Sequence, residues 1–117
     1  MNLILLWVFV LLLPVLGGCA SQPGLYRWGD YDNQVYAHFK NTGSTEEQIH
    51  ILEKTLQTNN QTQPPPPGYH AHLGLLYAKL GQSELMRAHW EAEKSLYPES
   101  ASFMDFLLNK STPMKTP

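Results

Sequence analysis

Cysteine, basic charge and strand patterns are all scarce in this sequence, and each scarcity excludes a class of protein. The single cysteine, Cys19, cannot form an internal disulfide and leaves no CxxC or Cys–His spacing for a zinc site. Eight Lys and Arg against ten Asp and Glu, a net charge of −2, provide no basic surface for nucleic acid. No segment shows the alternation that predicts a strand. A chain of 117 residues has room for one small domain.

Charged residues are also absent from positions 1–18, and residues 3–16 are apolar apart from Pro14. This stretch is shorter than the ~20 residues that a membrane-spanning helix needs, and it is typical of a signal peptide. It ends in Leu16-Gly17-Gly18-Cys19, which resembles the lipobox of bacterial lipoproteins. The resemblance implies cleavage before Cys19 and lipid attachment to it, although no Lys or Arg precedes the apolar stretch. The alternative is an ordinary secretory signal followed by a coincidental cysteine.

The residues after Cys19 indicate where the processed protein lies. In the lipoprotein-sorting pattern that this segment resembles, Asp directly after the cysteine retains the protein at the inner membrane. Ala20 stands there instead, which implies the outer membrane, with the periplasmic face as the expected side. Residues 19–24 form the lipidated tether. Because residues 20–24 reach at most ~17 Å when extended, we expect the folded domain, residues 25–109, to lie close to the lipid.

The remaining sequence predicts an all-α fold of about five helices. Apolar residues at helical spacing predict these helices at 30–40, 45–58, 69–80, 84–97 and 101–108. Ser44 and Glu47 fit a capping box, and Ser83 is expected to cap the fourth helix. The four consecutive prolines at 64–67 predict a stiff linker, with a ligand for a polyproline-binding partner as the alternative. Residues 110–117 are expected to be a disordered tail.

The fourth predicted helix carries two apolar stripes, which suggests that it packs against two neighbours. One stripe consists of aliphatic residues: Leu85, Ala88, Ala92 and Leu96. The second, beside it, consists of Met86, Trp90 and Tyr97.

Residues 67–100 resemble a tetratricopeptide repeat, a helix–turn–helix unit of ~34 residues. The positions that carry this resemblance are Leu73-Gly74, Tyr77, Gly81, Trp90 and Pro98. It implies that Gly74 lets the two helices of the unit approach closely. His70, Met86 and Glu93 depart from the pattern. Since one such unit cannot bury its own faces, we expect helices 30–40 and 45–58 to form a first hairpin and helix 101–108 to cover the second.

Three segments, 25–31, 66–74 and 93–100, carry a second resemblance that spans nearly the whole processed chain. They are similar to a family of small uncharacterised proteobacterial lipoproteins that share a domain of unknown function. Members are encoded beside a lipoprotein similar to the curli-secretion channel and another small lipoprotein. The resemblance therefore implies a role in envelope assembly, with another envelope lipoprotein or a secretion-channel-like complex as partner.

His89 and Glu93 form the most notable candidate site. Their i, i+4 spacing predicts that the side chains meet between the two apolar stripes. A carboxylate that orients an imidazole suits general-base chemistry, but a partly buried pair that fixes packing is the preferred interpretation. His70 and His72, at i, i+2, point to different sides of their helix and are not expected to share a metal ion.

Tyr26 and Trp28 are candidate interaction residues near the lipid anchor. Their rings are equally suited to the membrane interface and to docking onto the helices. Taken together, these features predict a non-enzymatic interaction or assembly module, anchored to the outer membrane and needing no metal or cofactor. The alternatives are a cell-wall-related hydrolase that uses His89 and Glu93, or a small-ligand binder in the same region.

Overall fold

Five α-helices make up the domain in the computed structural model, which describes residues 2–4, 7, 24–58 and 62–111. They are α2 (Tyr31–Lys40), α3 (Thr45–Gln57), α4 (Tyr69–Lys79), α5 (Ser83–Leu96) and α6 (Ala101–Ser111), with a short 3-10 helix, η2 (Pro98–Ser100), before α6. No strand occurs in these residues, so the predicted all-α class is confirmed. Cys19, Ala20 and most of the predicted signal peptide lie outside the described residues.

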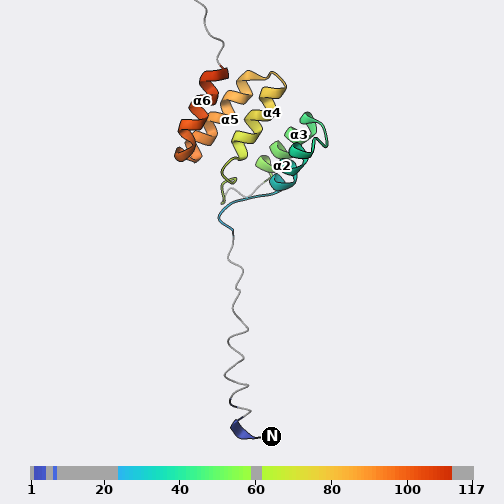
Figure 1. Ribbon diagram of the computed structural model, residues 1–117, viewed down its shortest axis with the longest axis vertical. Coiled ribbons are helices and arrows are strands. Elements are labelled where there is room, and N and C mark those ends of the chain that lie inside the picture. The colour runs from blue at the N-terminus through green and yellow to red at the C-terminus, as the bar shows by residue number, and fades with distance from the viewer. Residues whose placement is uncertain (1, 5–6, 8–23, 59–61, 112–117) are drawn as a thin grey trace, which may run out of the picture.

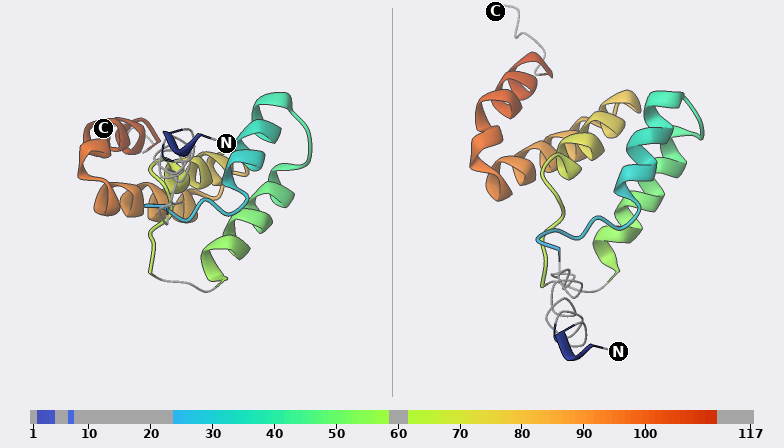
Figure 2. Two further views of the ribbon diagram at one scale, coloured as in Figure 1. Left: turned by 90° about the horizontal axis from the view of Figure 1, so that it is seen from below. Right: turned by 60° about the horizontal axis from the view of Figure 1, so that its bottom comes forward.

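The helices stack as two antiparallel pairs followed by a single helix (Figure 1). Helices α2 and α3 form the first pair, α4 and α5 form the second, and α6 packs against α5. Figure 2 shows the same order from two other directions, with α4 and α5 between the first pair and α6. Among the residues that the structure describes, no helix has both the length and the apolar character to cross a membrane.

The ends of the helices follow local chemistry, with two corrections to the predictions. Ser44 caps α3 as expected, because its Oγ accepts a hydrogen bond from the Glu47 backbone N–H at 3.0 Å. Ser83 does not cap α5; it is the first helical residue, and Gln82 precedes it with no side-chain cap bond. The predicted tail begins too early, since α6 continues to Ser111. Asn109 and Lys110 are part of this helix.

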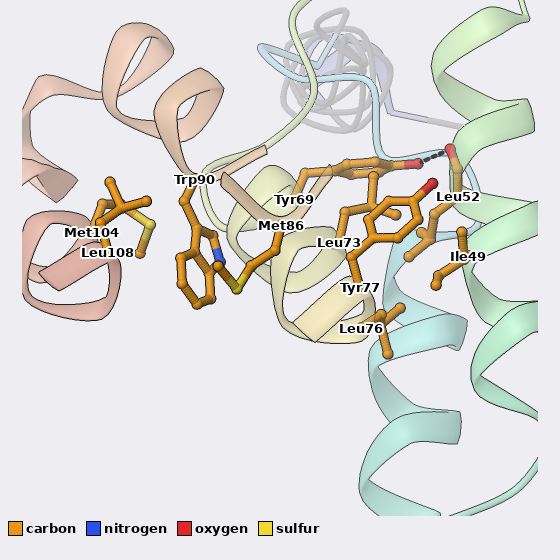
Figure 3. Packing of buried hydrophobic residues seen from close by; sticks show 10 residues of the cluster. All are labelled: Ile49, Leu52, Tyr69, Leu73, Leu76, Tyr77, Met86, Trp90, Met104 and Leu108. Atoms are coloured by element: carbon orange, nitrogen blue, oxygen red, sulfur yellow. Dashed lines mark hydrogen bonds between the residues drawn. The ribbon is translucent and has the colours of Figure 1, made fainter. Parts of the chain in front are cut away.

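The core lies mainly along α4, the central helix (Figure 3). Tyr69, Leu73 and Leu76 of α4 and Leu52 of α3 are fully buried. Tyr77 of α4 also belongs to the cluster, and residues of the other helices extend it: Ile49, Met86, Trp90, Met104 and Leu108. The Tyr69 hydroxyl keeps its hydrogen-bonding capacity satisfied inside this cluster by donating to the Leu52 carbonyl at 2.8 Å.

Gly74 is the point of closest approach between α4 and α5, as the repeat pattern predicts. A Cβ built at this position would lie 2.3 Å from both Cδ1 and Nε1 of the Trp90 ring, so no larger residue fits without displacement. The indole is 4% exposed, and its N–H donates to the Ala71 carbonyl at 3.1 Å. Gly74 and Ala71, two small residues of α4, therefore leave room for the Trp90 ring of α5.

Only one of the two predicted stripes of α5 is buried. Met86, Trp90 and Tyr97 are 4–7% exposed and face the core, as expected. Leu85 and Leu96 are each 43% exposed, so their stripe lies at the surface. The reason is that Trp90 contacts both neighbours: it packs against α4, and in Figure 3 Met104 and Leu108 of α6 lie on its other side. One stripe thus serves both helices.

The proline segment is packed into the domain. Pro65 and Pro66 are buried. The Pro64 carbonyl accepts from the Arg27 N–H at 2.9 Å, and the Pro65 carbonyl accepts from the Tyr97 hydroxyl. The segment, which links α3 to α4, therefore also connects the chain before α2 to the end of α5.

We predict that Gly74→Leu destabilises the protein, because the new side chain must displace the Trp90 ring. Overpacking of this kind costs ~1–3 kcal/mol, which is a large part of a small domain's stability. Thermal unfolding followed by circular dichroism should show a lower Tm. Ala88→Leu introduces the same residue at an exposed position of α5 and should melt close to wild type. If both variants have the same Tm as wild type, the close packing at Gly74 is contradicted.

Candidate functional site

Glu93 lies at the centre of the contact between α4 and α5. It is only 2% exposed, and its carboxylate accepts hydrogen bonds from the backbone N–H groups of Gly68, His70 and Ala71 at 2.6, 3.1 and 3.2 Å. These are donors in the first turn of α4, where a helix leaves N–H groups unpaired and the helix dipole favours a negative charge. Gly68, the N-cap residue, has no side chain to supply a cap. Glu93 therefore caps α4 from the neighbouring helix.

A second polar network joins α3, α4 and α5. Glu53 of α3 accepts from the Tyr77 hydroxyl at 3.0 Å, and its same oxygen lies 2.9 Å from Nε2 of His89. Nδ1 of His89 lies 2.9 Å from Nδ1 of His70. The His89 ring lies nearly parallel to the rings of His70 and Tyr77, with centroids 5.2 and 5.3 Å away. We call Glu53, Tyr77, His89 and His70 the histidine network.

The hydrogen bonds assign the protons of the histidine network. An ionised Glu53 accepts only, so Nε2 of His89 carries the proton that it donates to the carboxylate. Nδ1 of His89 is then bare and accepts from the N–H at Nδ1 of His70. Burial lowers the pKa of His70 to about 4 and raises the pKa of Tyr77 to about 12. Both groups are therefore neutral near pH 7, and the network is a short hydrogen-bonded chain that ends at Glu53.

The predicted pair of His89 and Glu93 does not form. His89 bonds to Glu53 and His70, whereas Glu93 bonds to the N-terminal turn of α4. A carboxylate does orient the imidazole of His89, but it comes from α3. Sequence reasoning missed Glu53 because helix periodicity relates residues of one helix only. The signal for Glu93 was present: a buried acidic residue needs donors, and the glycine before α4 leaves donors unpaired.

His70 and His72 lie on different sides of α4, as their spacing predicts. His70 contacts His89 of α5, whereas the His72 ring lies at α2, with centroids 6.1 Å from Tyr31 and 5.0 Å from His38. Burial lowers the pKa of His72 to about 4, and the neighbouring charges of His38 and Lys79 act in the same direction. Within the described part of the chain, no group of three or more His, Cys, Asp or Glu side chains is arranged to hold a metal ion.

Tyr26 and Trp28, the two aromatic residues near the tether, lie in different environments. Tyr26 is half-buried and meets the Tyr97 ring edge to face, with centroids 6.1 Å apart. Trp28 is 51% exposed and touches Tyr31 with one side of its ring, at a centroid distance of 6.1 Å. Tyr26 therefore docks onto the helices, while Trp28 is available at the surface.

Two grooves lie outside the histidine network. The larger, about 320 Å³, runs beside the proline segment and is lined by Arg27, Leu56, Thr62, Gln63, Pro64, Pro65 and Leu96. The smaller, about 220 Å³, lies between α2 and α3 and is lined by Gln34, Ala37, Thr42, Gly43, Glu47, Gln48 and Ile51. Neither groove is lined by a residue of the histidine network.

A family comparison covers most of this helical domain. The model of a domain of unknown function, DUF4810, matches residues 25–107. The chain belongs to this family. The match spans α2 to most of α6 and includes Glu93 and the histidine network. No curated protein and no solved structure matches the chain. The DUF4810 assignment agrees with the predicted membership of an uncharacterised family.

Double-mutant cycles should distinguish the observed partners from the predicted pair. We expect His89→Phe and Glu53→Leu to be coupled by ~0.5–3 kcal/mol, because each removes the other's hydrogen-bond partner. The cycle of His89→Phe with Glu93→Leu should show weaker coupling. Glu93→Leu alone should lower the free energy of unfolding by ~1–3 kcal/mol, since it leaves donors of α4 unpaired. The measurement is urea unfolding, and strong coupling restricted to the Glu93 cycle would restore the original pair.

Acid should destabilise the folded domain through its buried histidines. The pKa values of His70 and His72 are about 4 in the folded protein, below the ordinary histidine value of 6.5. Between these values the unfolded chain binds protons more readily, so the stabilisation present above pH 6.5 is lost as the pH falls toward 4.

A substitution at His72 tests this pH dependence. Tm should fall from neutral to mildly acidic pH, and His72→Phe should reduce that fall because the variant lacks one of the groups that bind protons on unfolding. His50 is exposed, so His50→Gln serves as the control and should keep the wild-type pH dependence. Indistinguishable pH profiles for the His72 and His50 variants would show that His72 titrates normally.

Proposed function

We propose that this DUF4810 chain is a lipid-anchored protein of the outer membrane that acts, without catalysis, as an interaction or assembly module in the cell envelope. The anchor is Cys19, and the partner is another envelope protein, such as a lipoprotein or a secretion-channel-like complex. The residues that hold the partner lie on the exposed apolar faces of the first and last helices of the domain.

The exposed aromatic side chains of these two helices carry the proposal. On α2, Tyr36 and Phe39 are 65% and 81% exposed. On α6, Phe103 and Phe106 are 60% and 54% exposed, and their rings stack at a centroid distance of 6.5 Å. Stacked helical proteins normally end in helices with polar outer faces, which keep them soluble. Terminal helices with aromatic faces instead favour a protein that is completed by a partner.

The arrangement of polar residues also favours binding over catalysis. The hydrolase alternative assigns a joint role to His89 and Glu93, whereas these side chains bind different partners. Glu93 is engaged with three backbone donors of α4, and His89 with two side chains. Both residues thereby contribute to the packing of helices, which is the role that an interaction module requires of its interior.

Site-specific photo-crosslinking in intact cells tests this function. A photoreactive residue at Phe103 should yield an adduct with one defined envelope protein. The same residue at Asn109, an exposed polar position of α6, should not yield it. The adduct should appear in the outer-membrane fraction and decrease in a Cys19→Ser variant, which should also lose incorporation of radiolabelled palmitate.

Each part of the proposal has its own contradicting result. Palmitate that still enters the Cys19→Ser variant would overturn the anchor. Equal crosslinking at Phe103 and Asn109, or none at either position, would overturn the interaction face. In a protein without the photoreactive residue, Phe103→Ser combined with Phe106→Ser should abolish co-purification of the envelope protein that the adduct identified. The Tm of this double variant should stay nearly unchanged, because surface substitutions usually alter stability by less than ~0.5 kcal/mol.

A further inference from the structure

The connecting segment before α2, residues 24–30, crosses one end of the helical domain (Figure 1). It has no regular structure of its own, yet it is attached at several points. The Arg27 N–H donates to the Pro64 carbonyl at 2.9 Å, and the Tyr31 N–H donates to the Trp28 carbonyl at 3.0 Å. The Gly24 carbonyl accepts from the Gln63 side chain.

Side chains along this segment divide into two sets. Tyr26 packs inward on Tyr97, and Gly29, in the left-handed conformation with φ of 54°, lies directly against the Thr55 side chain. Leu25 and Trp28 point outward and are 81% and 51% exposed. Because their neighbours in the chain are docked, Leu25 and Trp28 are held at the surface in a defined position. A backbone that is already ordered loses little further conformational entropy on binding.

Leu96, at the end of α5, belongs to the same end of the molecule. It lines the larger groove together with Arg27, Pro64 and Pro65, which adjoin the connecting segment, and it is 43% exposed. We call Leu25, Trp28 and Leu96 the tether-side surface. It combines two aliphatic side chains with a tryptophan, the residue type enriched where membranes meet water.

The chain before Gly24 determines what this surface meets. If Cys19 carries the lipid, its acyl chains lie in the hydrocarbon and its backbone lies at the headgroups. Residues 20–24 then place Leu25 no farther than ~17 Å from the headgroup layer, even when fully extended. A tether path shorter than this maximum brings the tether-side surface toward that layer, which is ~5–8 Å deep on each side of the bilayer.

We propose that Leu25, Trp28 and Leu96 form a membrane-contacting surface that inserts into the phospholipid headgroup region and fixes the orientation of the domain on the bilayer. This inference rests on the proposed lipid anchor at Cys19. Insertion removes exposed apolar area from water, and the amphipathic indole of Trp28 is suited to the boundary between headgroups and acyl chains. The domain is then held by its lipid and by this surface together.

Tryptophan quenching by brominated lipids tests the contact. The full-length lipidated protein is reconstituted into vesicles of phosphatidylethanolamine and phosphatidylglycerol, with or without bromine on the acyl chains. After cleavage before Cys19, its tryptophans are Trp28 and Trp90. Trp90 is 4% exposed and enclosed by α4, so contact quenching reports on Trp28. We expect quenching in wild type, a blue shift of emission on reconstitution, and loss of both in Trp28→Phe.

Matched surface variants separate this contact from general adsorption. Leu25→Ser and Leu96→Ser should decrease the quenching of Trp28. Leu85→Ser, which removes another side chain of α5 with the same 43% exposure as Leu96, should leave it unchanged. An equal effect of all three variants on the quenching of Trp28 would overturn the membrane-contacting surface.

Failure of the anchor gives a different result from failure of the contact. Protein that floats with the vesicles and carries lipid on Cys19, but shows the same fluorescence with and without bromine, overturns the contact alone. Protein without lipid on Cys19 that does not float with the vesicles overturns both the anchor and the contact. Flotation and mass spectrometry of the N-terminal peptide are therefore measured on the same samples.

Discussion

The capping of α4 by Glu93 is the interaction on which the arrangement of the second helical pair depends. Gly68 supplies no side-chain cap, so the first N–H groups of α4 take their acceptor from the last turns of α5. This requirement places the end of α5 beside the start of α4. With that register, Trp90 lies opposite Gly74 and Ala71, and His89 lies opposite His70.

The same register carries the polar contacts between the two helical pairs. His89 reaches past α4 to Glu53 of α3, and the hydroxyls of Tyr69 and Tyr77 bond to Leu52 and Glu53. Buried polar groups destabilise a fold unless they are satisfied, and these groups are satisfied only when α3, α4 and α5 are all in place. The network therefore specifies how the first pair docks, while the apolar core supplies most of the favourable free energy.

The sequence predicts the helices and their close contact well because both depend on local patterns. Apolar spacing locates all five helices, the Ser44 cap is correct, and Gly74 is correctly placed against the neighbouring helix. The partners of His89 and Glu93 could not be predicted in this way, since they lie on other helices. Likewise, periodicity identifies two stripes on α5 but does not tell that Trp90 is wide enough to serve both neighbours and leave Leu85 and Leu96 exposed.

Contacts with distant residues also determine which side chains of the connecting segment, residues 24–30, face outward. Tyr26 faces inward because its ring packs against the Tyr97 ring. Gly29 faces inward because it has no side chain, which leaves room for the Thr55 side chain. These two contacts determine that Leu25 and Trp28 face outward. The segment crosses one end of the domain, whereas α6 lies along its side (Figures 1 and 2). A domain held at the lipid by the tether-side surface would therefore keep the face of α6 that bears Phe103 and Phe106 open to a protein partner, so both proposed contacts can be made at once.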